Sequence, residues 1–147
     1  MQAIKIPIIN VSNNPNPEYA TSGSSGMDIR AFLSSPVTLQ PLERQLIPTG
    51  LFVQIPEKYE IQIRPRSGLA FKQGITCLNT PGTIDSDYRG EIKVLLINLS
   101  HEPQIIQNNE RIAQMVLSKI ETAVLETVEM IEETLRGSGG FGHTGKS

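Results

Sequence analysis

The stretch from residue 44 to residue 64 reads RQLIPTGLFVQIPEKYEIQIR, and it decides the fold class. Short apolar runs alternate in it with prolines, a glycine and charged residues. Frequent punctuation of this kind is typical of a turn-rich β fold. We therefore expect three strands here, at Arg44–Pro48, Leu51–Ile55 and Tyr59–Arg64, with a Pro-Thr-Gly turn between the first two.

The same pattern continues along most of the chain, where 12 glycines and 10 prolines are scattered rather than pooled in one linker. Further strands are expected at Ile4–Val11, Met27–Phe32, Val37–Leu39, Gly74–Leu78, Glu91–Asn98 and Arg111–Ile120. The first of these contains a proline, so it should be an edge strand. The spacing of the strands predicts an all-β sandwich, barrel or jelly roll.

Two segments have helical character. Gly68–Gln73 follows Ser67, a good N-cap residue, but Gly74 leaves room for only a turn or two. In Ile120–Leu135 apolar residues recur at helical spacing, while part of the segment alternates as a strand would. Periodicity alone slightly favours a helix there.

Composition bounds the function. The 147 residues include 13 basic and 15 acidic side chains, a net charge of −2 that argues against a general nucleic-acid or anionic-membrane binder. The single cysteine, Cys77, cannot form an internal disulfide and fits a reducing compartment. The N-terminus resembles neither a signal nor a transit peptide, and no apolar run approaches membrane-spanning length. We therefore expect a soluble, cytoplasmic protein that binds neither nucleic acid nor membrane.

The segment RPRSGLA (64–70) has the makings of an anion site. A strand ends at its proline, and Ser67 and Gly68 open a short helical turn with exposed N–H groups. Gly68 would let an oxyanion approach the backbone, while Ser67 and Arg66 add donors. Taken alone, the segment favours the alternative, an ordinary capped turn with surface arginines.

Two aspartates stand in LNTPGTIDSDYRGEI (78–92), a connection between strands that is rich in turn formers. Asp85 lies between an apolar residue and a tight turn, where it could be a general base or a carboxylate near a metal. The alternative, a turn cap and a solvated side chain, is strong for Asp87 and weaker for Asp85.

Polar residues also enter two apolar strands. Asp28 lies inside GMDIRA (26–31), and its alternative reading is a pair with Arg30 on one strand face. Arg111 and Gln114 lie in the strand near residue 111, and their alternative is a polar strand edge. Spacing alone leaves both questions open.

The last twelve residues, RGSGGFGHTGKS (136–147), contain five glycines and no face that could pack, so we expect a flexible tail. Phe141 suits a segment that closes over a ligand better than it suits a linker. The sequence has no His/Cys cluster with metal spacing, no P-loop and no Gly-x-Ser-x-Gly elbow.

Five segments, in this order, resemble the five motifs of the trimeric dUTP diphosphatase (dUTPase) family. They read SGMDIRA (25–31), PRSGLA (65–70), NTPGTIDSDYRGEI (79–92), NERIAQMV (109–116) and RGSGGFGHTG (136–145). The resemblance covers nearly the whole chain. It implies a distorted jelly roll or β-barrel of short strands with one very short helix, and it is our reason to expect no helix at 120–135. It also implies a β domain at 1–135 and a flexible arm at 136–147 that closes over the active site.

The resemblance implies hydrolysis of dUTP to dUMP and pyrophosphate, with Asp85 as the base that activates the water attacking the α-phosphorus. The implied substrate contacts are Asn79, Thr83, Ile84 and Lys93 at uracil, Tyr88 against the deoxyribose, and Arg66, Ser67, Gly68 and Gln114 at the phosphates, with Arg111 in support. The arm adds Phe141 over uracil and places Arg136 and Thr144 at the γ-phosphate.

The resemblance further implies Mg²⁺ held mainly by the phosphates, with Asp28 holding waters around the ion. Active sites between subunits imply a homotrimer. Such an enzyme limits uracil incorporation into DNA and supplies dUMP for thymidylate synthesis. The chain departs from the family at His143, where serine is more usual, so a phosphate contact at position 143 stays open.

Three other functions were weighed. A dCTP deaminase, or a bifunctional deaminase, needs a group for the exocyclic amine of cytosine, and no extra acid is placed for it. A binding module that has lost catalysis should show damage at Asp85, Tyr88 or the tail. A generic phosphate-binding β domain would leave the uracil hairpin unexplained.

Overall fold

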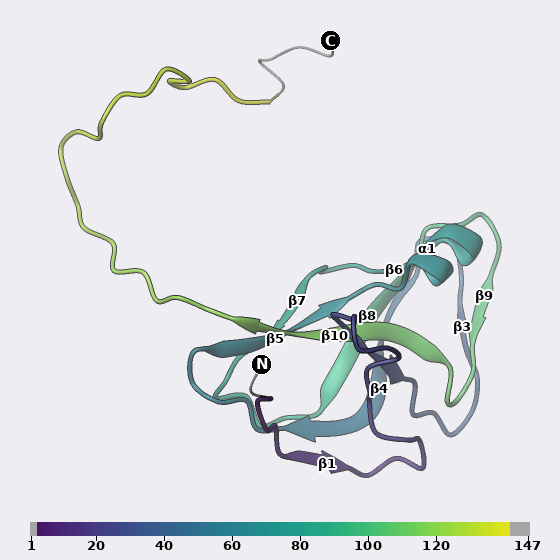
Figure 1. Ribbon diagram of the computed structural model, residues 1–147. Coiled ribbons are helices and arrows are strands. Elements are labelled where there is room, and N and C mark those ends of the chain that lie inside the picture. The colour runs from purple at the N-terminus through teal and green to yellow at the C-terminus, as the bar shows by residue number, and fades with distance from the viewer. Residues whose placement is uncertain (1–2, 142–147) are drawn as a thin grey trace.

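The computed structural model describes residues 3–141 and consists mostly of antiparallel strands (Figure 1). Its elements are β1 (Ile8–Asn10), β2 (Met27–Arg30), β3 (Val37–Leu39), β4 (Arg44–Val53), β5 (Tyr59–Arg64), α1 (Ser67–Gln73), β6 (Ile75–Cys77), β7 (Gly82–Ile84), β8 (Ile92–Asn98), β9 (Gln104–Ile106) and β10 (Arg111–Lys119). None of the helical residues described forms a helix long and apolar enough to cross a membrane.

The strands form three sheets. Two have four strands each, in the orders β1-β4-β8-β6 and β2-β10-β5-β7, and β3 pairs with β9 in a third. Inward side chains of both large sheets, including Ile47, Val94, Ile61 and Ile112, belong to one buried cluster. The expected all-β fold with one short helix is confirmed, and across residues 3–141 the strands form open sheets rather than a closed barrel.

The strand β4 corrects one prediction, because it runs through Pro-Thr-Gly without a turn. Its register with β8 shifts there, which is a β-bulge. Gly50 has a φ of 71°, in the left-handed region that glycine adopts readily. The buried Thr49 hydroxyl donates to the Ile92 carbonyl at 2.6 Å and accepts from the Leu51 N–H at 3.2 Å. These bonds hold the bulge in the sheet.

Smaller differences concern element ends. The edge position expected for the first strand is confirmed, but β1 begins after Pro7 because proline cannot donate to the ladder. Ser67 is the first residue of α1 and not its N-cap, because the Ala70 N–H donates to the Arg66 carbonyl. Two short strands, β7 and β9, were not predicted.

The chain after β10 has neither helix nor strand through residue 141 (Figure 1). The Ile120 N–H still donates to the Lys58 carbonyl at 2.9 Å. Beyond it, residues 121–138 are all exposed, including Val124, Leu125 and Ile131. Helical spacing there does not produce a helix because no surface of this chain covers the apolar side. The expected absence of a helix at 120–135 is confirmed, while the domain boundary at residue 135 stays a prediction.

Candidate active site

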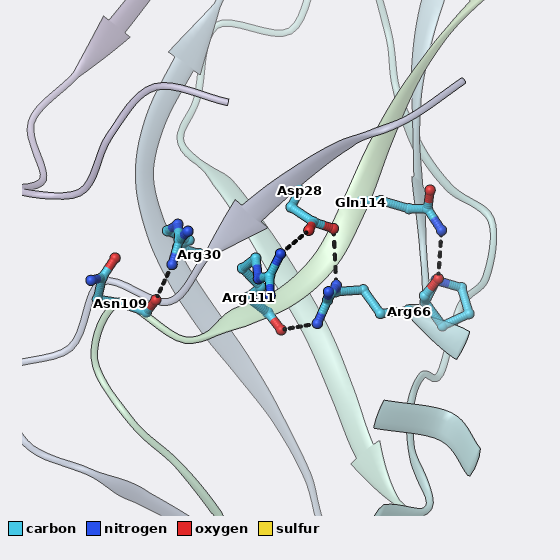
Figure 2. Close-up of polar contacts among 7 residues, drawn as sticks. Asp28, Arg30, Arg66, Asn109, Arg111 and Gln114 are labelled. Atoms are coloured by element: carbon cyan, nitrogen blue, oxygen red, sulfur yellow. Dashed lines mark hydrogen bonds and ion pairs between the residues drawn. The ribbon is translucent and has the colours of Figure 1, made fainter. Parts of the chain in front are cut away.

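The first group of polar residues, which we call the charged cluster, consists of Asp28, Arg66, Arg111 and Gln114. It exists because β10 lies between β2 and β5, and Gln114 is paired with Asp28 on one side and Arg64 on the other. Arg66 follows the end of β5, and its side chain reaches back across β10 toward β2 (Figure 2).

Asp28 joins the two arginines of the charged cluster. One carboxylate oxygen accepts from Arg66 Nε at 2.9 Å, and the other accepts from Arg111 Nη1 at 3.2 Å (Figure 2). Arg66 Nη1 also donates to the Arg111 carbonyl at 3.3 Å. The alternative pair of Asp28 with Arg30 is wrong, because Arg30 donates to the Asn109 carbonyl instead. Two arginines against one carboxylate leave this cluster positive, as an anion site requires.

Gln114 is held from two sides. Its amide nitrogen donates to the Pro65 carbonyl at 3.1 Å, just before Arg66. A Cβ at Gly26 would overlap the Gln114 side-chain oxygen and lie 3.3 Å from Val116 Cγ2. Gly26 therefore allows the amide to lie directly against the backbone that leads into β2.

Space for a ligand adjoins this cluster. Asp28, Gln114, Gly26 and Ser25 line a pocket of about 310 Å³, and Asp28 also borders a smaller one with Arg30 and Arg111. Ser67 and Gly68 are exposed at the start of α1, and a Cβ on Gly68 would meet nothing within 4 Å. An anion could thus approach this backbone without a clash.

The second group forms what we call the hairpin pocket. It has a volume of about 380 Å³ and is lined by Leu46, Thr83, Ile84, Asp85, Tyr88, Glu91 and Lys93. Most of these residues follow one another from β7, through a turn in which the Tyr88 N–H donates to the Asp85 carbonyl at 3.1 Å, into β8. Four of the implied substrate contacts and the implied base therefore share one cavity.

Asn79 lies beside this hairpin rather than among the lining residues. A Cβ at the buried Gly82 would come within 3.3 Å of the Asn79 amide nitrogen and 3.4 Å of Ile63 Cβ. The asparagine amide therefore lies against the backbone of β7, whose glycine leaves room for it.

The two groups lie at opposite ends of β5. Ile84, next to Asp85, pairs with Ile61, and Arg66 lies five residues further along the chain than Ile61. At the usual rise of a strand this is a separation of roughly 15 Å. A single chain therefore does not bring Asp85 and Arg66 together.

The arm is apart from both groups. Arg136 Nε donates to the Gly139 carbonyl at 2.9 Å within the arm itself, and Phe141 is fully exposed. Figure 1 shows this yellow segment extending away from the sheets. Thr144 and His143 lie outside the described residues.

Two lining residues of the hairpin pocket were missed in the sequence. Glu91 accepts from the Gly50 N–H at 2.9 Å and has its other carboxylate oxygen 3.9 Å from Lys93 Nζ. A carboxylate between a glycine and a buried strand was a signal for it. Leu46 had no such signal, because its place depends on its pairing with Leu95 across β4 and β8.

Known relatives identify the class of this enzyme as nucleotidohydrolases. The chain is 60% identical over 142 residues to the deoxyuridine 5'-triphosphate nucleotidohydrolase of Finegoldia magna, covering 97% of this chain and 99% of the relative. It is 59% identical over 141 residues to the enzyme of the same name from Cytophaga hutchinsonii, covering 96% and 92%.

Solved structures agree. The Staphylococcus bacteriophage 80alpha dUTPase with dUpNHpp superimposes with a TM-score of 0.82 at 26% identity, covering 97% of this chain and 99% of that one. The family model for dUTPase matches residues 12–145. The chain belongs to the dUTPase family, and its activity is the hydrolysis of dUTP.

Proposed function

We propose that Asp85 is the general base of dUTP hydrolysis and that each active site is assembled between subunits of a homotrimer. Asp85 takes a proton from a water whose oxygen attacks the α-phosphorus. The bond from the α-phosphorus to the bridging oxygen breaks, and pyrophosphate leaves with that oxygen while dUMP remains. The observation that carries the proposal is the position of Asp85 in a pocket with neutral lining residues, separated from the arginines along β5.

The hairpin pocket suits the uridine half of the substrate. Backbone groups of Thr83 and Ile84, the Asn79 amide and the main chain of Lys93 would read uracil, because hydrogen bonds to the base edge distinguish it from cytosine. The Tyr88 ring would lie against the deoxyribose and leave no room for a 2′-hydroxyl. In the bacteriophage 80alpha enzyme a dUTP analogue is bound, which supports such a pocket here.

The charged cluster suits the triphosphate half. Arg66, Ser67, Gly68 and Gln114 would hold phosphate oxygens, with Arg111 kept in place through Asp28. Positioned cations stabilise the charge that develops on departing pyrophosphate, and they do so without reorganising during the reaction.

The residues present fit a magnesium ion held mainly by substrate. No group of three His, Cys, Asp or Glu side chains that could hold a metal occurs within residues 3–141. Asp28 is partly exposed beside a pocket, and each of its oxygens accepts one arginine bond, so further lone pairs can accept from metal-bound water. When bound, Mg²⁺ would neutralise phosphate charge. The phage phi11 dUTPase, 24% identical with a TM-score of 0.77, coordinates a structural Mg(II) ion.

Exposed apolar side chains support the contact between subunits. Leu46 and Leu78 flank Leu95 on the outer face of β4-β8-β6, beside the hairpin pocket, and they are 60% and 46% exposed. A neighbouring chain that covered these leucines would bring its own Arg66 toward Asp85. The arm would then close the site, with Phe141 over uracil and Arg136 and Thr144 at the γ-phosphate.

The cellular role follows from this reaction. A cytoplasmic enzyme of this kind would limit uracil incorporation into DNA and supply dUMP for thymidylate synthesis.

The test of substrate is pyrophosphate release from dUTP, dTTP, dCTP and UTP, measured side by side. We expect dUTP to be hydrolysed far faster than the others. Equal rates would remove the uridine pocket from the proposal, and ammonia released from dCTP would point to a deaminase instead.

Mixing variants tests the shared site. Asp85→Asn chains and Arg66→Ala chains are each expected to be nearly inactive. If the two halves come from different subunits, refolding both variants together at equal amounts should restore about a quarter of the sites by random assortment. No recovery in mixed trimers would show that both residues must come from one chain.

A further inference from the structure

The ring of Tyr88 lies directly against the backbone of Gly90. A Cβ built at Gly90 would overlap the Tyr88 hydroxyl oxygen and lie 2.5 Å from Cζ and 2.9 Å from Cε2. These three atoms, the nearest to that Cβ, all belong to this one ring. The ring therefore occupies the volume that any side chain at position 90 would need.

A hydrogen bond keeps the ring in this place. The Tyr88 hydroxyl donates to the Glu91 carbonyl at 2.9 Å, so the ring folds back over its own turn. Tyr88 remains 43% exposed, and its outer side is part of the hairpin pocket.

The acceptor of that bond is itself fixed by the bulge in β4. The Glu91 carboxylate accepts from the Gly50 N–H at 2.9 Å, and the next carbonyl, of Ile92, accepts from the Thr49 hydroxyl at 2.6 Å. The backbone under the ring is thus tied to the core sheet, and the side chain at position 90 remains the variable that decides where the ring lies.

We propose that Gly90 is a positioning residue that sets selectivity for the sugar by allowing the Tyr88 ring to lie against the turn. This rests on the proposed function, in which that ring faces the deoxyribose. A methyl group at position 90 displaces the ring toward the substrate or out of the pocket, and either movement spoils its fit to the sugar.

The displacement should cost little stability. Gly90 does not have a left-handed backbone conformation, so alanine is compatible with its dihedral angles. The group in the way is the far end of an exposed side chain, which can swing aside. A selectivity effect without an unfolding effect is therefore expected.

The experiment compares Gly90→Ala with wild type and with Gly23→Ala, a matched change at a glycine that has nothing within 4 Å of a built Cβ. The readouts are kcat and KM for dUTP and for UTP, together with thermal melting. For Gly90→Ala we expect the ratio of kcat/KM for dUTP over UTP to fall about tenfold or more, mainly through a higher KM for dUTP. Gly23→Ala should keep the wild-type ratio. A wild-type ratio in Gly90→Ala would overturn the proposal.

A double variant separates action through the ring from action on the backbone. If Gly90 acts through Tyr88, adding Gly90→Ala to Tyr88→Ala leaves the ratio unchanged. The same fall in the presence and absence of the ring would refute the proposal. If Gly90→Ala alone fails to fold, a folded double variant supports a clash with the ring, whereas an unfolded one overturns it. Failure of the wild type to hydrolyse dUTP would instead reject the proposed function itself.

Discussion

The hairpin pocket and the charged cluster are built in different ways. The pocket comes almost entirely from consecutive residues, Thr83 to Lys93, in one turn between two strands. The charged cluster collects Asp28, Arg66, Arg111 and Gln114 from three strands that meet only through their register. Local sequence therefore shapes the part that would recognise the nucleoside, whereas tertiary pairing shapes the part that would hold phosphate.

Loss of the base would break this comparison most severely. Asp85→Asn removes the carboxylate from the hairpin pocket but leaves the charged cluster intact. We expect kcat to fall on the order of 10²-fold or more, the usual contribution of a general base, while a non-hydrolysable dUTP analogue still binds. Pyrophosphate release and calorimetry measure the two effects. Asp87→Asn, a change at an exposed neighbour outside the pocket lining, serves as the control. Near-normal turnover in Asp85→Asn would refute the assignment.

Removal of the arm tests whether the two regions suffice without a cover. A chain that ends at Leu135 lacks Arg136 and Phe141, neither of which contacts the sheets in the described part of the arm. Thermal melting and trimer mass should therefore stay as in wild type. We expect activity to fall about tenfold or more, because an open site admits bulk water and weakens the contacts to phosphate. Full activity would exclude a lid.

Asp28→Asn sharpens the comparison from the side of the charged cluster. It removes the negative charge between Arg66 and Arg111, and with it the proposed acceptor for metal-bound water. We expect the Mg²⁺ concentration for half-maximal rate to rise roughly threefold to tenfold, at or below the lower end of what supporting groups contribute. Glu57→Gln, a carboxyl-to-amide change at an exposed residue before β5, is the control. An unchanged Mg²⁺ titration would separate Asp28 from the metal.

Thr49→Val should weaken the support under the hairpin pocket without touching the charged cluster. The valine has a similar shape but leaves the Ile92 carbonyl and the Leu51 N–H without their partner. We expect a loss of about 1–3 kcal/mol in the free energy of unfolding, measured with urea. Thr49→Ser keeps the hydroxyl and should lose less. Equal stability of Thr49→Val and wild type would show that the bulge does not depend on this group.

The smallest effect concerns Cys77, at the end of β6. Burial raises the pKa of its thiol to about 11 from an ordinary value of 9.0. The folded state thus holds the neutral thiol, and the stability this contributes is fully present below pH 9 and is lost as the pH rises toward 11. At pH 8 a thiol reagent should label unfolded chains quickly and folded chains slowly. Rapid labelling of the folded enzyme would contradict this.

The success of sequence reasoning follows the same division. The acid, the tyrosine and the turn formers of the hairpin are close in sequence, so their shared place could be predicted. The partners of Asp28 could not, because spacing offered Arg30 and the register supplied Arg66 and Arg111. The continuous β4 was also out of reach, since its bulge depends on a bond to a residue 43 positions away.

The position of β10 between β2 and β5 has an evolutionary consequence. One residue inserted or deleted within it would turn each later side chain to the opposite face. Gln114 and the buried Met115 would exchange environments, so catalysis and folding would be damaged by the same event. Length variation among descendants of this gene should therefore avoid β10 and accumulate in exposed connections, such as the turn at 100–103.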